Sequence, residues 1–249
     1  SLPMILLSQQ EENRNLDDPR AVHYIAGFDY MLTPDTKFSI EVYSKEYSNL
    51  PMEPTDPTLF VIDDGRSLRH FQRYTALQDV GKAYSRGIEL LLQKKMAKDF
   101  YGIISGTYFR SRYEDLTGEW RNRTYDNQYM FSVLGGYKPN DSWEFSMKWS
   151  YAGGVPYTPF DMTASRAANA GIIDMTRINE SRYPAYHSLN IRADRRFFFK
   201  KSSLVLYTSI WNAYNRENVA MYYWDEVNNE KVEYLQWSLI PIIGMEFEF

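Results

Sequence analysis

The sequence has no cysteine, no long apolar run and no excess of basic charge. The absence of cysteine excludes disulfide frameworks, thiolate zinc sites and cysteine nucleophiles. The longest apolar runs, Pro3 to Leu7 and Leu239 to Ile243, fall far short of the roughly 18 residues that a membrane-spanning helix requires. Lysine and arginine total 28 against 32 acidic residues, so the charge balance disfavours a nucleic-acid partner.

Motifs for catalysis and for metal binding are also missing from the sequence. The histidines His23, His70 and His187 do not stand at metal-ligand spacing, and there is no nucleophile elbow, phosphate-binding loop or dinucleotide fingerprint. Acidic pairs such as Asp63-Asp64 lack the spacing of a calcium loop. We therefore expect no enzyme activity, no metal site and no cofactor.

The dominant pattern from Arg20 onward is an alternation of apolar and polar residues. Phe38 and Ile40, for example, alternate with Ser39 and Glu41, which is typical of a strand with two chemically different faces. An aromatic content of 16% and an apolar content of 44% also exclude a disordered chain. Nine strands are expected, near residues 20–32, 37–47, 82–95, 99–112, 126–138, 142–152, 184–196, 203–214 and 236–249.

One of these segments also has the composition of a helix. Residues 89–95 are good helix formers, but with a period of two Ile88, Leu90 and Leu92 fall on one side and Glu89 on the other. We predict a strand with Leu91 as its misfit, because propensity is a weaker guide than pattern.

Short and long connections between the strands alternate along the chain. This alternation places every long loop at one end of the sheet, as in outer-membrane barrels with short periplasmic turns and long extracellular loops. Trp143 beside a tight turn, with Trp149 and Tyr151 beside a long loop, fits the two aromatic belts of such barrels; ordinary core packing is the alternative. The predicted fold class is all-β, a transmembrane antiparallel β-barrel. The tight connections are 33–36, 96–98, 139–141 and 197–202, and the long ones are 48–81, 113–125, 153–183 and 214–235.

The last residues of the chain continue the apolar alternation. Phe249, Phe247 and Met245 form one face, and the glutamates between them turn to the other. This ending resembles the C-terminal signal by which bacterial outer-membrane proteins are recognised by their assembly machinery. Pro241, which has no amide donor, is expected to mark a bulge or a bonding gap in the last strand.

Several stretches resemble the C-terminal half of TonB-dependent outer-membrane receptors, particularly those of Bacteroidetes-type bacteria. Residues 19–28 resemble the strand after a long loop, and residues 82–90 resemble the family's G-x-E-L strand. Residues 151–160 resemble the entry to a late extracellular loop, while 188–194 and 211–219 resemble the two strands that precede the last. The resemblance implies a location in the outer membrane of a Gram-negative bacterium.

Such receptors have a barrel of about 22 strands filled by an N-terminal plug, and they import scarce nutrients with energy delivered by TonB. The resemblance implies that residues 1–249 form the last nine strands, with 1–19 as a partial extracellular loop. The expected partners are an N-terminal remainder with the plug and about thirteen strands, TonB through that plug and not this chain, outer-membrane lipids and lipopolysaccharide, the barrel assembly machinery and a surface lipoprotein.

The cargo stays open among a siderophore, cobalamin, an oligosaccharide and a peptide. A passive porin or structural barrel is the alternative function, and a soluble β-propeller or carbohydrate-binding sandwich is a third.

A ligand site is expected in the long loops, where function usually concentrates. Arginine offers a fork for carboxylates or phosphates, and tryptophan and tyrosine offer flat faces for a sugar or chelator ring. The alternative is that the arginines bridge lipopolysaccharide phosphates and the aromatic rings pack the loops together. The candidate ligand-binding residues are Arg66, Arg69, Arg73, Tyr74, Tyr113, Trp120, Arg121, Arg123, Tyr125, Tyr157, Phe160, Tyr222, Tyr223 and Trp224.

The polar face of the wall is expected to contact the plug rather than a ligand. Its expected members are Glu41, Lys45, Glu89, Gln128, Glu144, Lys148 and Arg192.

Overall fold

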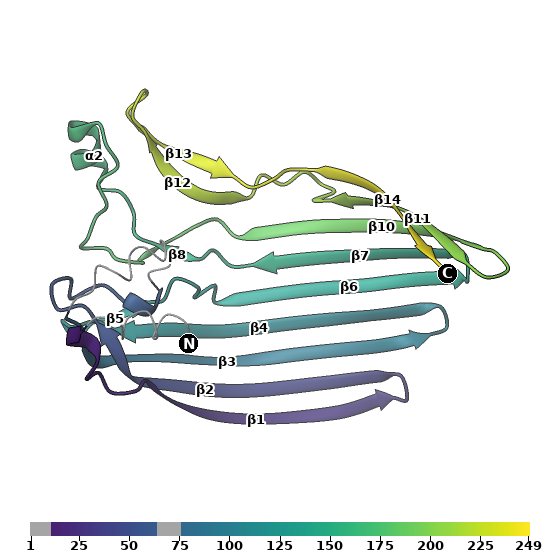
Figure 1. Cartoon of the computed structure of the whole chain (residues 1–249), viewed down its shortest axis with the longest axis horizontal. Helices are drawn as coiled ribbons and strands as arrows, with labels where there is room; N and C mark the ends of the chain where they lie inside the picture. Colours follow the sequence, from purple (N-terminus) through teal and green to yellow (C-terminus); the bar gives the residue numbers. More distant parts are fainter. Residues whose placement is uncertain (1–10, 64–75) are drawn as a thin grey trace.

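The computed structural model describes residues 11–63 and 76–249. Its long antiparallel strands lie side by side in one open sheet whose neighbours follow the order of the chain (Figure 1). The tight turns and the C-terminus lie at one end of the sheet, which we call the turn end, and the long connections lie at the other, the loop end (Figure 1). The nine predicted strands and the predicted separation of turns from loops are therefore confirmed. The strands are β1 (Arg20–Thr33), β2 (Thr36–Met52), β3 (Gln78–Ala97), β4 (Phe100–Glu114), β6 (Tyr129–Asn140), β7 (Trp143–Ala152), β10 (Tyr186–Phe198), β11 (Ser203–Trp211) and β14 (Ile240–Glu248).

The long connections contain short elements that the alternation pattern does not reveal. In Figure 1, α2 and the hairpin of β12 and β13 stand at the loop end, beyond the sheet. No helix in the described part of the chain is long and apolar enough to cross a membrane. The short elements are η1 (Glu11–Asn13), η2 (Val61–Asp63), β5 (Trp120–Asn122), β8 (Pro156–Tyr157), α2 (Met162–Ala168), β9 (Ser181–Arg182), β12 (Val219–Asp225) and β13 (Glu230–Leu235).

The strand register sorts the side chains into apolar and polar rows. Directly opposed residues of neighbouring strands point to the same face, so each row crosses the sheet at one height. Adjacent rows belong to opposite faces, which we call the apolar face and the polar face. One row of the apolar face consists of Tyr30, Phe38, Leu92, Ile104, Val133, Trp149 and Leu189. The adjacent row, on the polar face, consists of Asp29, Ser39, Leu91, Ser105, Ser132, Ser150 and Ser188.

The segment with helix-forming composition is part of β3, as the period of two predicts. Its backbone pairs with β2 on one side and β4 on the other. Leu91 occupies a position in the row of serines, between Ser39 and Ser105, and is the misfit that the pattern indicates. Two flanking strands thus impose an extended backbone on residues whose intrinsic preference is helical.

The loop ends of β2 and β3 extend past the predicted boundaries, to Met52 and from Gln78. The register shifts twice there, between Tyr47 and Leu50 and again between Leu50 and Met52. These irregularities break the alternation, so the sequence pattern does not show that pairing continues. A small buried apolar cluster stabilises the extension, and its members are Leu50, Met52, Phe60, Ala83 and Tyr113.

The last strand differs from the prediction in its start and in the role of Pro241. β14 begins at Ile240 rather than at residue 236, and its register with β11 runs without a shift from Ile240 to Glu248. The bulge, one of the two alternatives predicted at Pro241, is therefore wrong. Pro241 is the second residue of a strand with one neighbour in the described sheet, a position where a missing amide donor is tolerated.

Aromatic rings gather at both ends of the apolar face. Near the turn end, Phe100 stacks on Tyr137 with ring centres 4.5 Å apart, and Trp143 stacks on Phe145 at 5.6 Å. At the loop end, Tyr151 lies within 6.3 Å of four other rings. Trp143 and Tyr151 are separated by eight steps of one strand, about 26 Å of backbone. This spacing matches the aromatic girdles that flank the lipid-facing band of outer-membrane barrels.

Candidate functional site

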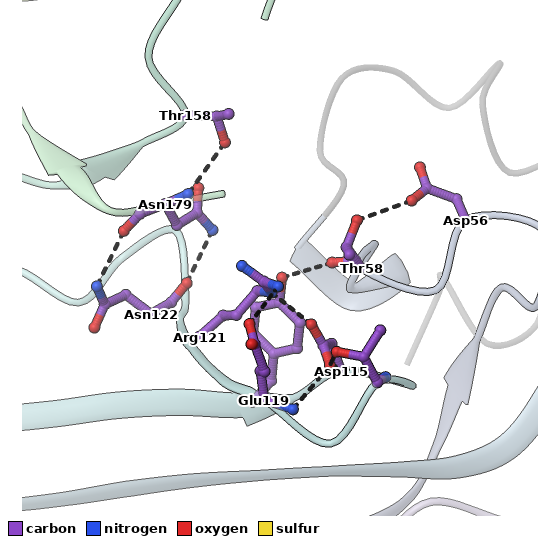
Figure 2. Close-up of polar contacts among 10 residues, drawn as sticks. Asp56, Thr58, Asp115, Glu119, Arg121, Asn122, Thr158 and Asn179 are labelled. Carbon is purple, nitrogen blue, oxygen red and sulfur yellow. Dashed lines mark hydrogen bonds and ion pairs between the residues drawn. The ribbon is translucent and has the colours of Figure 1, made fainter. Parts of the chain in front are cut away.

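The turn between β4 and β5 is built around the carboxylate of Asp115. This carboxylate accepts hydrogen bonds from the backbone amides of Thr117 (2.9 Å) and Glu119 (3.0 Å), and from the Thr117 hydroxyl at 2.6 Å. Arg121 Nε donates to its other oxygen at 2.5 Å. The Asp115 side chain is 0% exposed and that of Arg121 is 11% exposed, so the ion pair lies inside the loop. Figure 2 shows Arg121 between Asp115 and Glu119.

The charge on Asp115 is stabilised by these contacts. Burial alone would raise the pKa of the Asp115 carboxyl, but the hydrogen bonds from Thr117 and Arg121 outweigh it and lower the pKa below its usual value. The carboxylate is therefore charged throughout the neutral pH range.

Polar contacts join this turn to the neighbouring loops. The side-chain amide of Asn122 donates to the carbonyl of Asn179 (3.0 Å), and the Asn179 amide donates back to the carbonyl of Asn122 (2.9 Å), as Figure 2 shows. On the other side, the Tyr113 hydroxyl donates to the carbonyl of Thr58 at 2.7 Å. Residues from three long connections are thus tied into one assembly, which we call the loop latch.

Two further arginines complete the loop latch. Arg123 Nη2 lies 2.6 Å from a carboxylate oxygen of Asp63, and the Thr124 amide donates to the same carboxylate. Arg182 Nη2 lies 2.5 Å from the fully buried carboxylate of Asp126. Each arginine joins segments that are more than 50 residues apart in sequence.

A group of three tyrosines lies between the β8–β9 strands and the β12–β13 hairpin. The ring centres of Tyr157 and Tyr183 are 4.4 Å apart, and those of Tyr183 and Tyr222 are 5.0 Å apart. Lys231 Nζ stands 4.1 Å from the centre of the Tyr222 ring. Burial raises the pKa of each of the three phenols, so their hydroxyls are neutral at physiological pH.

A hollow of about 450 Å³ opens on the polar face at the loop end. Its floor contains Ser188 and Asn190 of β10 and Trp211 of β11, and its rim is formed by residues that follow β13, including Trp237. The side chain of Asn190 is fixed by the backbone amide of Asn212, which donates to it at 3.0 Å. Trp237 is 80% exposed and presents a large apolar surface beside these polar groups. Combined ring faces and amides of this kind suit a ligand that has both apolar and hydrogen-bonding surfaces.

The predicted ligand residues fall into different environments. Arg66, Arg69, Arg73 and Tyr74 lie outside the described residues. The structure uses Tyr113, Arg121 and Arg123 within the loop latch, where they contact other loop residues.

The remaining predicted residues are more accessible or pack in pairs. Trp120 lies opposite Glu114 on the side of the apolar face, with its ring 5.0 Å from that of Tyr84. Phe160 contacts buried Trp224 edge to face, whereas Tyr125 and Tyr223 are exposed. The structure brings together Tyr157 and Tyr222, but it does not gather all the candidates in one place.

Several residues of the loop end are not among the predicted ligand-binding residues. Tyr183 completes the tyrosine group, and Asn190, Trp211 and Trp237 line the hollow. The predicted strand 236–249 includes Trp237, but Gln236 to Leu239 precede β14. Two aromatic residues within 234–239, Tyr234 and Trp237, are the sequence signal that could indicate this rim.

The predicted polar face is present in the register. Glu41, Glu89 and Thr107 oppose one another across β2, β3 and β4, and Lys148 opposes Asn190. Lys45, Glu144 and Arg192 share this face by their register, and Gln128 precedes β6 with a left-handed φ of 71°. Across residues 11–63 and 76–249, no three histidine, aspartate or glutamate side chains are grouped so as to hold a metal ion.

Comparisons with known proteins identify the architecture. The chain is similar to the ferric-catecholate import receptor Fiu from E. coli K12, with 10% identity and a TM-score of 0.62 over 96% of this chain and 29% of that one. It is similar to the ferripyoverdine receptor of the outer membrane of Pseudomonas aeruginosa, with 13% identity and a TM-score of 0.63 over 96% and 28%. It is also similar to the ferric yersiniabactin uptake receptor FyuA from Yersinia pestis, with 14% identity and a TM-score of 0.58 over 92% and 29%.

The chain spans less than a third of the length of each of these three structures. No curated protein sequence matches it. The family described as "TonB dependent receptor-like, beta-barrel" matches residues 6–210, which is most of the sequence. This match agrees with the two-faced wall, the tight turns and the loop end described above, and the chain belongs to the TonB-dependent receptor β-barrel family.

Proposed function

We propose that this chain forms barrel wall and extracellular loops of an outer-membrane receptor that imports a scarce nutrient by TonB-energised transport. In this proposal the apolar face contacts lipid, the polar face lines the lumen and contacts a plug, and the loop end is extracellular. Other polypeptide segments complete the barrel and supply the plug through which TonB acts. The same arrangement implies contacts with outer-membrane lipids and lipopolysaccharide, with the barrel assembly machinery and with a surface lipoprotein.

This proposal rests on two features that occur together. Adjacent rows of side chains are apolar on one face and polar on the other, and the connections are short at one end of the sheet and long at the other. A row of apolar side chains crosses seven strands, and the adjacent row, one residue away on the opposite face, is mainly serine. Such a sheet is suited to separate lipid from an aqueous interior, and all of its long loops lie at one end.

A ferric siderophore is the first cargo to test. The three structural relatives named above are a ferric-catecholate import receptor, a ferripyoverdine receptor and a ferric yersiniabactin uptake receptor. The hollow with Trp237 and the tyrosine group offer ring faces for the aromatic or peptide-like parts of a chelator. Cobalamin, oligosaccharides and peptides belong in the same panel because these surfaces also suit them.

Uptake by cells that carry the receptor as their only route for each cargo tests the proposal. We expect one cargo to accumulate against its gradient, and we expect accumulation to stop when TonB is deleted or the proton-motive force is dissipated. Uptake that equilibrates and does not respond to either treatment would instead support a passive porin, which is the alternative function.

A further inference from the structure

A second hollow, of about 540 Å³, lies on the apolar face near the turn end. Its lining includes Gly135, Met147, Ile191 and Ile210, which oppose one another in a single row across β6, β7, β10 and β11. Glycine provides no side chain at one end of this row, so the floor there is formed by backbone. A Cβ at Gly135 would meet only the carbonyl oxygen of Tyr101, at 3.8 Å, so the space above this residue is open.

The next row toward the turn end forms the wall of this hollow on its turn-end side. It contains Phe100, Tyr137 and Phe145, followed by the smaller Ala193 and Thr208. The stacked rings of Phe100 and Tyr137 stand on one side, and the small residues leave a shallow path on the other. The hollow is thus an apolar depression in a surface that meets hydrocarbon chains in the proposed orientation.

An arginine lies one row closer to the turn end. Arg195 opposes Trp143, its guanidinium carbon stands 4.7 Å from the centre of that ring, and the Phe197 ring is at 5.5 Å. Among the described residues, no carboxylate forms an ion pair with Arg195. The other two arginines of β10 lie on the polar face and are paired, Arg192 with Asp194 and Arg196 with Glu248.

The positions of the Arg195 cation and the hollow along the strands match the shape of a phospholipid. Two residues of strand separate successive rows on one face, so Arg195 lies about 7 Å closer to the turn end than Ala193. Guanidinium binds phosphate through its planar fork, and an arginine in an aromatic belt extends its charged end toward the membrane surface. A phosphate at Arg195 would leave its acyl chains directed away from the turn end, along the hollow.

We propose that this part of the apolar face is a binding site for an anionic phospholipid of the periplasmic leaflet. Arg195 holds the phosphate, Trp143 and Phe197 flank the cation, and one acyl chain occupies the hollow above Gly135. The site rests on the proposed function, because the turn end must be periplasmic for this leaflet to supply the lipid.

The experiment uses the whole receptor that contains this sequence, embedded in nanodiscs of phosphatidylcholine with a minor fraction of phosphatidylglycerol. Native mass spectrometry after release from the nanodisc counts the phosphatidylglycerol molecules that stay bound. Arg195→Gln is expected to reduce retention about tenfold, which corresponds to the loss of one charge-assisted hydrogen bond. Gly135→Leu is expected to reduce retention by filling the hollow, because the nearest atom to a Cβ there, the Tyr101 carbonyl oxygen, lies at an ordinary contact distance of 3.8 Å.

The matched control is Arg196→Gln, which removes the same charge from the adjacent residue on the opposite face. Retention that is unchanged in Arg195→Gln, or reduced equally in Arg196→Gln, would overturn the proposal. Displacement of the lipid by millimolar inorganic phosphate alone would overturn the assignment to a phospholipid and indicate a simple anion site. Arg195→Gln in the full receptor is not expected to affect TonB dependence. If the unmodified receptor takes up cargo with TonB but retains no lipid, only this site is rejected. If it retains the lipid but shows no energised uptake, only the proposed transport is rejected.

Discussion

At the scale of single residues, Asp115 determines the conformation of the β4–β5 turn. Asp115→Asn keeps the size of the side chain but removes the charge that pairs with Arg121. We expect the local opening free energy of the turn to fall by about 2 kcal/mol, the contribution of a charge-assisted hydrogen bond in a buried setting. Hydrogen exchange of the Thr117 and Glu119 amides measures this change. The control is Glu119→Gln, which alters the 70% exposed partner of the same arginine and should have little effect; equal effects of the two variants would contradict the assignment.

The same carboxylate makes the turn sensitive to acid. Because the folded-state pKa of Asp115 is lowered, its stabilisation is fully present above the unfolded value of about 4 and is lost as the pH falls through the folded pKa. The difference in exchange protection between the unmodified chain and Asp115→Asn should therefore be constant above about pH 5 and shrink below about pH 4. A difference that persists unchanged to pH 2 would show that the charge is not its source.

Trp237 is the residue on which the ligand hollow can be tested most directly. Its 80% exposed ring makes no ring stacking contact in the described part of the chain, so Trp237→Ala should leave assembly unchanged. If the hollow binds the cargo, affinity should fall about tenfold, as for the loss of a stacking ring. Isothermal titration with the transported cargo provides the measurement. Val227→Ala, at a 92% exposed position in the hairpin tip, is the control, and equal affinity of all three proteins would remove Trp237 from the site.

Residue types were easier to predict than their partners. The sequence predicts Arg121 and Arg123 as ligand-binding loop residues, but they pair with Asp115, six positions away, and with Asp63, sixty positions away. The pairing of Arg123 with Asp63 depends on how two loops fold over each other, and the alternation of apolar and polar residues carries no information about the packing of loops. The alternative in which aromatic rings pack the loops together describes Tyr113, whereas Arg121 and Arg123 pair with loop carboxylates, a role that the prediction did not include.

At the scale of secondary-structure elements, the entry from β7 into the following connection depends on Gly154. A Cβ at this position would lie 1.6 Å from the carbonyl oxygen of Tyr183, and a backbone atom cannot rotate away as a side chain can. Gly154→Ala should therefore separate β8 from β9 and weaken the tyrosine group, at a cost of about 2 kcal/mol or more. Limited proteolysis of intact cells should show faster cleavage within residues 153–183. Gly27→Ala, where the nearest atom is at 3.6 Å, is the control and should be cleaved as slowly as the unmodified chain.

The strands were predictable because each must keep apolar and polar side chains on opposite faces along its whole length. Every wall strand has one apolar and one polar face along its length, so the alternation persists even in β3, where Glu89 to Lys95 favour a helix. The pattern ends where that constraint ends. Past Tyr47 the chain bulges and packs on Phe60 and Tyr113, and the pairing of Leu50 with Gly81 depends on contacts from distant loops.

At the scale of the whole molecule, the sheet has two open edges. Within the described residues, β1 pairs only with β2 and β14 pairs only with β11, which leaves backbone donors and acceptors without strand partners. Such groups cost several kcal/mol each in hydrocarbon. We expect the receptor purified from outer membranes to contain further strands on both edges, either in the same polypeptide or in a tightly bound one. A 29.4 kDa species that is monomeric and soluble without detergent would contradict this expectation.

The straight rows of the sheet also explain why proteins with this architecture can differ widely in amino-acid sequence. A wall position requires a chemical class, apolar on one face and polar or small on the other, and many residues satisfy it equally well. A single insertion within a strand is the exception, because it would move the later side chains of that strand to the opposite face. Structures that share only 10–14% of their residues with this chain can therefore keep the same wall, while the loops are free to adapt to different cargoes.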